Sequence, residues 1–408
     1  MLDLKFIRQN PEKVKEGLAK KQADVNIDEL LILDEKKRAI QQKIESLRFE
    51  QGKFGKDDIA KAQVIKAEIK TMEPALADID KALDILLRKI PNLPQDDVPF
   101  GKDDSENVVM REEGKKPKFD FPIKDYVEIG QNLDIIDTER ASKVAGTRFG
   151  YLKGGAAMLE FALINLVMDT LTKEGFIPVV PPVMLKPEMM ESMGYVERGA
   201  DEIYYLEKDK LYLVGTSEQS IGAMHANETF EEKDLPKRYA GFSTCFRREA
   251  GAYGKDTKGI LRVHQFDKIE MFSFCHPEKS KEEHQFLLKM EERLMQALEL
   301  PYHVLRICSG DLGDPAAAKY DIEAWLPGQN QYRETHSTSN CTDFQARRLN
   351  VKYRDSKTKK PEFVHTLNGT AFAIGRTLIA IIENYQQKDG SILVPKALQK
   401  YVGFKKII

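Results

Sequence analysis

An arginine, a glutamate and a phenylalanine in the middle of the chain supply the types of side chain that a nucleotide site uses. Arg247 and Glu249 stand two residues apart, and Phe266 follows after a loop rich in glycine. An arginine can fork onto a phosphate, a carboxylate can accept the amino hydrogens of adenine, and an aromatic face can support the ring. Taken alone, an Arg-Arg-Glu segment is more typical of a solvated strand edge. Its interpretation therefore depends on the neighbouring segments.

Farther along the chain, Glu334 and Ser337 offer two hard oxygen ligands three residues apart. Such ligands suit a Mg²⁺ ion that also bridges the phosphates of ATP, although one carboxylate and one hydroxyl also occur in ordinary polar surface clusters. Arg376 interrupts the apolar helical pattern of residues 368–384. A guanidinium in that setting needs an anionic partner, either a carboxylate in the core or a phosphate of a bound nucleotide.

Three further positions carry reactive or polar side chains with an ordinary structural explanation. Thr216 with Gln219 fits a helix capping box. His264 and His336 could act as bases, but a single histidine is more often a structural hydrogen-bonding residue. We therefore leave both histidines out of the catalytic set.

The elements that must position these residues begin near Phe119, where helical patterns alternate with short β-type runs such as 210–214 and 268–274. The amphipathic segment 157–171 is closed by Gly175 and leads into a strand at 177–182. Periodicity alone predicts an α+β fold with a helical rod in front of it.

The rod is predicted by apolar residues that repeat in steps of three and four, from Leu30 to Phe54 and from Ile65 to Ile90. Residues 51–58 carry two glycines and several charges, which indicates a turn. An antiparallel helical hairpin, a coiled coil with arms of roughly 25–30 residues and on the order of 40 Å, follows. Its basic residues could meet phosphates, while a structural or dimerising coiled coil is the alternative.

Prolines and polar residues after Ile90 mark a boundary. We predict a hairpin arm over residues 1–100, a linker over 101–118 and a catalytic domain over 119–408.

The composition excludes several other classes of protein. The 408 residues have a formal charge of -2, so no global signature of nucleic-acid binding is present. Four cysteines without a C-x-x-C pair favour reduced thiols over a zinc site or a disulfide framework. The sequence begins without a signal peptide and contains no apolar run of roughly 20 residues. We expect a cytoplasmic protein with no membrane contact.

Four segments together resemble the class II aminoacyl-tRNA synthetases. Residues 246–270 resemble motif 2, with a form that looks specifically seryl, and 368–384 resemble motif 3. Residues 334–348 resemble a signature of the seryl-tRNA synthetase family, and the helix and strand at 157–182 look like those that join two subunits. The likeness extends from the first residues to the Glu383-Asn-Tyr-Gln-Gln segment.

This resemblance implies an antiparallel sheet flanked by helices, preceded by the hairpin, in a homodimer. It implies a ligase that activates L-serine with ATP and Mg²⁺, without zinc. The product would be transferred to tRNA(Ser), and also to tRNA(Sec) in some members, with the hairpin binding the tRNA.

The resemblance also assigns residues to roles. The catalytic residues it implies are Arg247, Glu249 and Arg376. The ATP-binding residues are Arg247, Arg248, Glu249, Val263, Phe266, Glu334, Thr335, His336, Ser337 and Arg376. The serine-binding residues are Thr216, Ser217, Glu218, Arg247, Glu270 and Thr370. The Mg²⁺ ligands are Glu334 and Ser337.

Two features depart from the family pattern. His336 stands where relatives commonly carry a smaller residue, and the tip of the hairpin is short.

Three other functions share parts of this pattern. Another class II synthetase would share the ATP site but not the 334–348 segment. A ligase that loads a carrier protein would lack the long hairpin. A non-catalytic RNA-binding paralogue would have lost its phosphate ligands, whereas Arg247, Glu249, Glu334 and Arg376 are all present.

Overall fold

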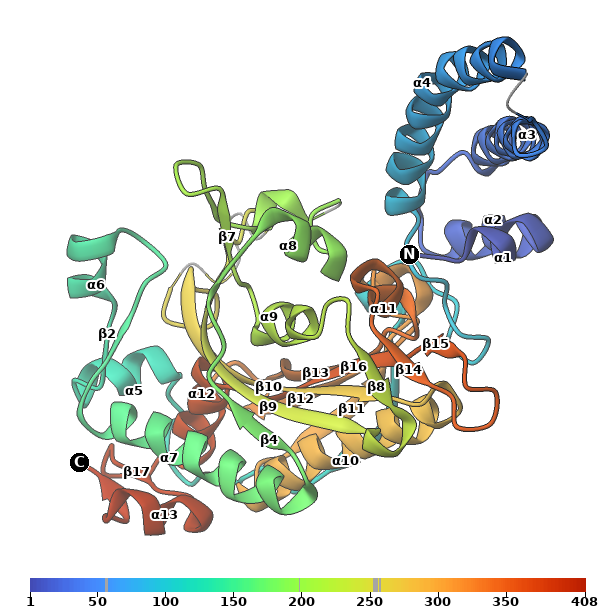
Figure 1. Ribbon diagram of the computed structural model, residues 1–408. Coiled ribbons are helices and arrows are strands. Elements are labelled where there is room, and N and C mark those ends of the chain that lie inside the picture. Colours follow the sequence, from blue (N-terminus) through green and yellow to red (C-terminus); the bar gives the residue numbers. More distant parts are fainter. Residues whose placement is uncertain (56–57, 198, 252–255, 257) are drawn as a thin grey trace. The chain divides into compact units, whose positions relative to one another are not determined.

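The apolar repeat near the N-terminus forms two long helices, as its spacing predicts. The structure is a computed structural model that describes residues 1–55, 58–197, 199–251, 256 and 258–408 (Figure 1). It divides into two units, residues 1–93 and 94–408. In the described part of the first unit the helices are α1 (Leu4–Gln9), α2 (Pro11–Lys20), α3 (Ile27–Gln51) and α4 (Ile59–Lys89).

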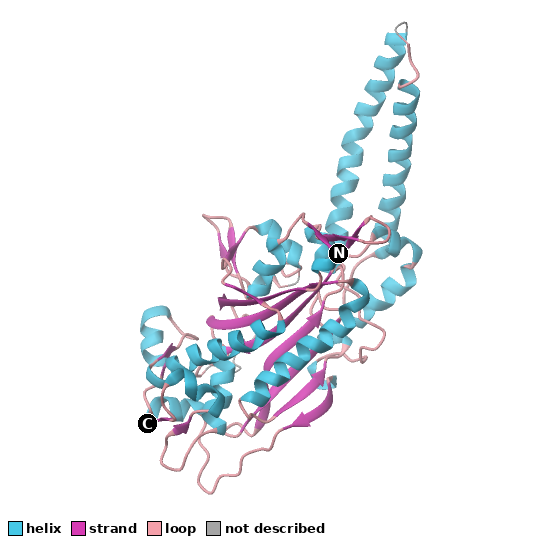
Figure 2. Ribbon diagram, turned by 60° about the horizontal axis from the view of Figure 1, so that its bottom comes forward, coloured by secondary structure: helices cyan, strands magenta, loops and turns pink. Residues whose placement is uncertain are grey.

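Helices α3 and α4 form the predicted hairpin, and they lie side by side in Figure 2. Their shared seam buries Ile44 against Ile65 and Ile69. Ion pairs join the two helices, among them Lys37 to Asp80 at 2.6 Å, Lys43 to Glu68 at 2.8 Å and Arg48 to Glu73 at 3.6 Å. The end of α3 contacts the start of α4, where Gln51 Nε2 donates to Ala62 O at 3.4 Å, so the helices are antiparallel. Residues 56–57, in the predicted turn, lie outside the described residues.

The second unit is built on an eight-stranded sheet in the order β1-β11-β12-β13-β16-β10-β9-β4. All neighbours are antiparallel except β4 and β9, so the predicted antiparallel sheet is confirmed with one parallel edge. The strands are β1 (Val108–Glu113), β4 (Ile177–Val179), β9 (Lys237–Phe246), β10 (Gln265–Cys275), β11 (Tyr302–Arg306), β12 (Ala318–Leu326), β13 (Gln331–Asn340) and β16 (His365–Ala373).

The two faces of the sheet have different surroundings, and β10 shows the difference best. Ile269 and Met271 belong to the main core, which is shared with α7 (Gly154–Leu171), α10 (Ser280–Ala297) and α12 (Ile374–Asn384). Phe272 and Phe274 point the other way, into a second core formed with α9 (Ser217–Met224). Because side chains alternate along a strand, the remaining even positions of β10 also lie on the α9 face.

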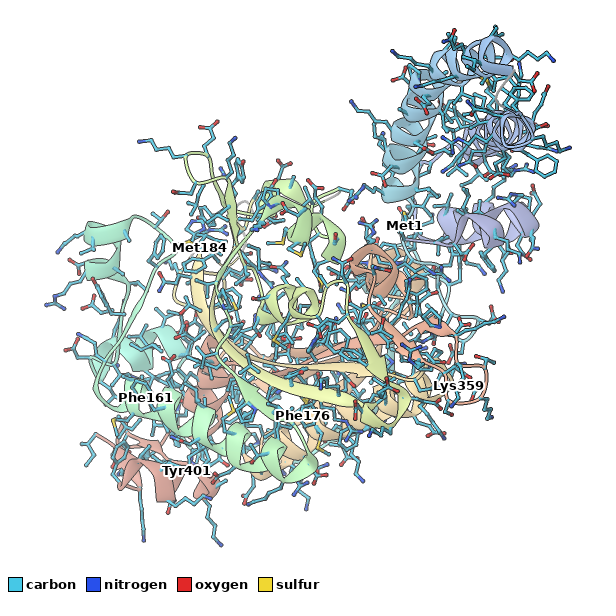
Figure 3. All side chains as sticks on the ribbon, viewed as in Figure 1. Met1, Phe161, Phe176, Met184, Lys359 and Tyr401 are labelled. Atoms are coloured by element: carbon cyan, nitrogen blue, oxygen red, sulfur yellow. The ribbon has the colours of Figure 1, made fainter. Side chains whose placement is uncertain are left out.

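Helix α7 joins its apolar residues to the main core on one side and exposes apolar residues on the other. By length and composition alone, Gly154–Glu174 is long and apolar enough to cross a membrane, as are many core helices of globular proteins. Burial of Leu159, Leu163 and Val167 in the core accounts for much of that hydropathy. Phe161, labelled in Figure 3, is 61% exposed. Met158, three residues earlier on the same helix, is also exposed, and a patch of exposed apolar side chains commonly marks a contact surface.

Shorter elements surround this framework. The remaining helices are α5 (Tyr126–Asn132), α6 (Thr138–Ala145), α8 (Pro187–Met193), α11 (Phe344–Leu349) and α13 (Lys396–Val402). The small sheets pair β2 (Ile136–Asp137) with β3 (Tyr151–Leu152), and β17 (Ile392–Leu393) with β18 (Lys406–Ile407). Two three-stranded sheets contain β5 (Met184–Leu185), β7 (Leu211–Leu213) and β6 (Tyr205–Leu206), and β15 (Pro361–Phe363), β14 (Lys352–Arg354) and β8 (Thr229–Glu231).

Residues 101–118, which the sequence analysis assigns to a linker, include the edge strand β1. All six of its residues are exposed, so the strand lacks the alternation of buried and exposed side chains that marks a strand in a sequence. Pairing with β11 holds its backbone. The division between the two units falls between Leu93 and Pro94.

Candidate active site

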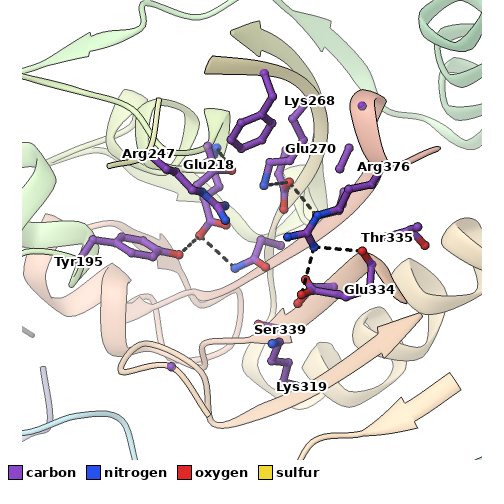
Figure 4. A pocket seen from close by; sticks show the side chains of 18 of the residues that line it. Tyr195, Glu218, Arg247, Lys268, Glu270, Lys319, Glu334, Thr335, Ser339 and Arg376 are labelled. Carbon is purple, nitrogen blue, oxygen red and sulfur yellow. Dashed lines mark hydrogen bonds and ion pairs between the residues drawn. The ribbon is translucent and has the colours of Figure 1, made fainter. Parts of the chain in front are cut away.

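A cavity of about 380 Å³ lies on the α9 face of the sheet (Figure 4). Its lining brings together residues from β10, β13, β16, the start of α12 and the start of α9. The predicted site residues that line it are Thr216, Glu218, Arg247, Glu249, Val263, Phe266, Glu270, Glu334, Thr335, Ser337, Thr370 and Arg376. Three of the predicted site residues, Ser217, Arg248 and His336, are absent from it.

Strand β10 supplies one wall through alternate residues. Phe266, Lys268 and Glu270 follow one another at intervals of two and all line the cavity. The Lys268 ammonium lies 2.6 Å from Glu270 Oε2. Thr370, directly opposite on β16, donates its hydroxyl to the same oxygen at 3.2 Å. Glu270 is therefore held from its own strand and from the neighbouring one.

Helix α9 brings a second carboxylate to the same end of the cavity. Thr216 is the N-cap of this helix, and its hydroxyl accepts the Glu218 N–H at 3.4 Å. The Glu218 side chain accepts hydrogen bonds from Tyr195 Oη at 2.5 Å and from Asn368 Nδ2 at 3.1 Å, both at Oε1. Burial, reinforced by the charge of Glu270, raises the pKa of Glu218 to about 7.

The predicted capping box at this helix is replaced by a shifted pair of bonds, because Thr216 accepts from Glu218 and Gln219 accepts from the residue before the N-cap. Gln219 Oε1 accepts the N–H of Gly215 at 2.9 Å, and Gly215 precedes the N-cap. Ser217 is fully buried and donates its hydroxyl to Gly241 O at 3.0 Å. Ser217 thus ties α9 to β9 and does not face the cavity.

Arg247 follows β9 and lies beside Phe266. Its guanidinium carbon is 5.3 Å from the centre of the Phe266 ring, and Nε donates to Gly215 O at 3.3 Å. Arg248 turns away, with its guanidinium 5.6 Å from the centre of the Tyr204 ring. Because Arg247 and Phe266 are in contact, a planar ring could share the aromatic face with the arginine.

Glu249 also follows β9 and is held near the loop. It has a φ of 52° and lies 3.6 Å from Arg262. Residues 252–255 and 257 of the loop between β9 and β10 lie outside the described residues.

The predicted metal ligands share one face of β13 because the strand contains a β-bulge. Glu334 pairs with Glu323 and Ser337 with Asp321, two residues apart on β12, so one extra residue is accommodated at 335–336. In a regular strand, residues three apart would point to opposite faces. The bulge returns Glu334 and Ser337 to the same side, and both line the cavity.

Arg376, from the first turn of α12, is the anchor of Glu334. Its Nη1 lies 3.2 Å from Glu334 Oε2 and donates to Glu334 O at 3.0 Å. Partial removal from water would raise the pKa of Glu334, but the charges of Arg376, Lys319 and Arg247 outweigh it and hold the pKa at about 2. The anionic partner of Arg376 within the chain is therefore Glu334, which stays ionised.

His336 does not reach the cavity. It is fully buried, and its Nδ1 hydrogen-bonds with Thr335 Oγ1 at 2.8 Å. Its ring packs against Phe372. Burial lowers the pKa of His336 to about 3, so the imidazole is neutral.

The donor set around Glu334 fits a cation that keeps part of its own hydration. Ser337 hydrogen-bonds to Asp321, which orients its hydroxyl oxygen. Across the described residues, no group of three His, Cys, Asp or Glu side chains could hold a metal. Two oxygen ligands suit Mg²⁺, which is usually bound by one or two protein groups together with substrate phosphates and water, and they do not suit zinc.

Six lining residues with polar side chains lie outside the predicted site set: Tyr195, Lys268, Lys319, Ser339, Cys341 and Asn368. Lys268 carried a usable signal, because it lies midway between Phe266 and Glu270 on one face of a strand. Lys319 lies 3.0 Å from Asp321, two residues farther along the same strand β12. Its place in the cavity wall depends on the pairing of β12 with β13, which the periodicity of a single strand does not reveal.

Comparisons with known proteins cover both units. The model of the "tRNA synthetase class II core domain (G, H, P, S and T)" matches residues 204–385, and that of the "Seryl-tRNA synthetase N-terminal domain" matches residues 1–94. The serine–tRNA ligase of Thermobifida fusca is 46% identical, over 99% of this chain and 98% of its own length. That of Dictyoglomus turgidum is 44% identical, over 100% and 99%.

Solved structures give the same result. The crystal structure of seryl-tRNA synthetase from Pyrococcus horikoshii complexed with ATP has a TM-score of 0.94 and 42% identity, covering 100% of this chain and 99% of that one. The cytoplasmic serine–tRNA ligase of Naegleria fowleri in complex with AMP has a TM-score of 0.92 and 38% identity, covering 100% and 98%.

Proposed function

The chain belongs to the seryl-tRNA synthetase family, and from that premise we propose that it activates L-serine with ATP and transfers the seryl group to the 3′ end of tRNA(Ser). The observation that carries the proposal is a single cavity whose two ends carry different groups, one suited to an amino acid and the other to a nucleotide. Glu218 and Glu270 gather at one end, and Glu334 with Arg376 at the other. Arg247 lines the same cavity.

The acidic end suits the amino acid. The ammonium group of serine needs carboxylate acceptors, and its hydroxyl needs polar neighbours more than a deep apolar pocket. Glu218, Glu270, Thr216 and Thr370 supply these groups. Arg247 would bind the carboxylate of serine and the α-phosphate of ATP, which brings the two reacting groups together.

The other end suits ATP. Phe266 and Val263 offer an apolar bed for adenine, and Glu249 offers an acceptor for the adenine amino group. Arg376 would hold the γ-phosphate. When bound at Glu334 and Ser337, Mg²⁺ would neutralise charge on the phosphates. Catalysis would consist of positioning and electrostatic stabilisation, as the serine carboxylate attacks the α-phosphorus and pyrophosphate leaves.

The geometry supports a smaller set of binding residues than the resemblance implies. Ser217, Arg248 and His336 do not line the cavity, so we propose that they support neighbouring elements instead. Ser217 fixes α9 to β9, Arg248 packs on Tyr204, and His336 fills the core beneath the bulge.

We assign the transfer step to both units together. The hairpin formed by α3 and α4 would bind tRNA(Ser), through exposed lysines that contact phosphates. The exposed apolar face of α7 would join two copies in a homodimer. The reaction would take place in the cytoplasm, with tRNA(Sec) as a possible second acceptor.

The test is amino-acid-dependent exchange between ATP and pyrophosphate with all twenty amino acids, and Arg247→Ala as the control against contaminating enzyme. Serine alone should support exchange, and the variant should lose it. Exchange with a different amino acid would overturn the choice of serine. A well-folded protein without any exchange would favour a non-catalytic RNA-binding role.

A further inference from the structure

The two carboxylates at the acidic end of the cavity are each held at a single oxygen. Glu218 Oε1 accepts from Tyr195 and Asn368, and Glu270 Oε2 accepts from Lys268 and Thr370. Among the described residues, no hydrogen bond involves Glu218 Oε2 or Glu270 Oε1. One oxygen of each carboxylate is thus left for a ligand, and Figure 4 shows both side chains in the cavity.

Two buried carboxylates that share a cavity repel each other, so an additional positive charge is needed if both are to receive a cation. Lys268 supplies that charge from inside the protein. Its side chain is only 7% exposed, and its ammonium lies 2.6 Å from Glu270. Lys268 is buried and contacts Glu270 from two residues away on the same strand. Its charge therefore acts directly on a carboxylate that faces the ligand.

We propose that Lys268 is a positioning residue of the amino-acid pocket, which holds Glu270 in place and offsets the repulsion between Glu270 and Glu218 so that one ammonium group can bind to both. The inference rests on the proposed function for the identity of the amino acid. It adds a residue whose role is to prepare the pocket, without itself contacting the α-ammonium group.

The other ionisable groups around Glu218 and Glu270 do not supply the positive charge that offsets the repulsion between these two carboxylates. Burial raises the pKa of Tyr195 and of the Cys245 thiol, so both stay neutral at neutral pH. Burial, together with the charge of Glu270, also raises the pKa of Glu291 on α10 well above its usual range. Cys341 lines the same cavity as a thiol. The two cations whose charges lower the pKa of Glu218 are Lys268 and Arg247.

Arg247 cannot replace Lys268, because its contacts lie elsewhere. Its Nε donates to Gly215 O, and its guanidinium packs against Phe266 at the junction with the ATP end. Loss of Lys268 would therefore leave Glu270 with Thr370 as its remaining donor.

The pH dependence of serine binding gives a signature. The pKa of Glu218 is about 7, so the KM for serine should fall as the pH rises through about 7 and the carboxyl group ionises. Because the charge of Lys268 lowers this pKa, a neutral residue at position 268 should move the transition to higher pH. A shift of about one pH unit corresponds to about a tenfold higher KM on the acidic side of the transition.

The experiment compares full-length wild type with Lys268→Met, Lys268→Gln and Lys268→Arg, each checked for folding by its thermal unfolding temperature. KM for serine and KM for ATP are measured by pyrophosphate exchange between pH 6 and pH 9. Lys352→Met, which removes a lysine that does not line the cavity, is the matched control. Serine and L-glycerate, which carries a hydroxyl in place of the ammonium, are compared as ligands by calorimetry.

We expect both neutral variants to raise the KM for serine about fivefold at pH 7 and about tenfold at pH 6, to leave the KM for ATP within twofold, and to move the transition to higher pH. Lys268→Arg should restore most of the serine affinity, and L-glycerate binding should change little. An unchanged transition, or equal increases in both KM values, would overturn the inference. If the wild type used another amino acid, the choice of serine would fail, and the same comparison with that amino acid would judge Lys268.

Discussion

Tyr126 on α5 lies outside the segments that carry the family resemblance. Its hydroxyl nevertheless holds the backbone of residues 258–260, which lead into β10. Tyr126 Oη accepts the N–H of Ile260 at 3.1 Å and donates to Lys258 O at 3.3 Å. Ile260 and Leu261 then line the cavity. Tyr126→Phe removes this hydroxyl and keeps the ring. The variant therefore measures what the two hydrogen bonds contribute to stability and to ATP binding, with the packing of the ring unchanged.

The size of the effect follows from what is left unpaired. Tyr126 is 4% exposed, and burial raises its pKa to about 12, so the hydroxyl is neutral. In the variant the buried N–H of Ile260 loses its partner, which costs about 1–3 kcal/mol, whereas Lys258 is exposed and its carbonyl can bond to water. If about 1.4 kcal/mol of this cost falls on the bound loop conformation, the KM for ATP rises about tenfold.

Urea denaturation and pyrophosphate exchange measure the two effects. The matched control is Tyr353→Phe, which removes a hydroxyl bonded to His276 Nε2 at 3.1 Å and does not line the cavity. The control should lower stability without changing the KM for ATP. A Tyr126→Phe variant with unaltered stability and KM would refute the reasoning, as would an equal rise in KM in the control.

Three further outcomes are expected. Burial raises the pKa of Glu383 to about 7 from an ordinary 4.5, so the wild type loses stability as the pH rises between these values. Glu383→Gln removes that titration, and its unfolding free energy relative to wild type should improve by about 2 kcal/mol from pH 5 to pH 8, measured by urea denaturation at each pH. An offset that does not vary with pH would contradict this. Phe161→Glu should place charges in the α7 contact surface and give a monomer in sedimentation, whereas a retained dimer would move the interface elsewhere. Lys66→Glu with Lys70→Glu should raise the KM for tRNA in charging assays and flatten its salt dependence, with unchanged pyrophosphate exchange. Normal charging would assign RNA binding to another surface.

The elements with strong periodicity were predictable from the sequence. The hairpin seam and the α+β class were confirmed, because a long amphipathic repeat has few alternative structures. Strand β1 escaped prediction because every one of its residues is exposed and its order depends on pairing with β11. Non-local hydrogen bonds of this kind leave no trace in the local pattern.

The cavity was predictable to the extent that its residues sit in recognisable segments. Lys268 could have been found by extending the alternation of β10 from Phe266 to Glu270. Tyr195 and Asn368 could not, since both are brought to Glu218 from segments far away in the sequence. His336 is the converse case, a predicted site residue that does not line the cavity. It adjoins two lining residues, Thr335 and Ser337, but the strand turns its side chain into the core.

The bulge at residues 335–336 also sets a rule for exchanging parts between related proteins. The alternation of side chains between the two faces of β13 is interrupted at the bulge. One regular stretch ends at Glu334, and a second begins at Ser337 and continues through Ser339. A transplanted segment that lost a single residue here would still let β12 pair with β13. It would turn either Glu334 or Ser337 to the opposite face of the sheet, so the two side chains would no longer share the cavity. A chimera whose two junctions lie on either side of the bulge keeps Glu334 and Ser337 on the same face of the strand. A junction inside the bulge has to be designed residue by residue.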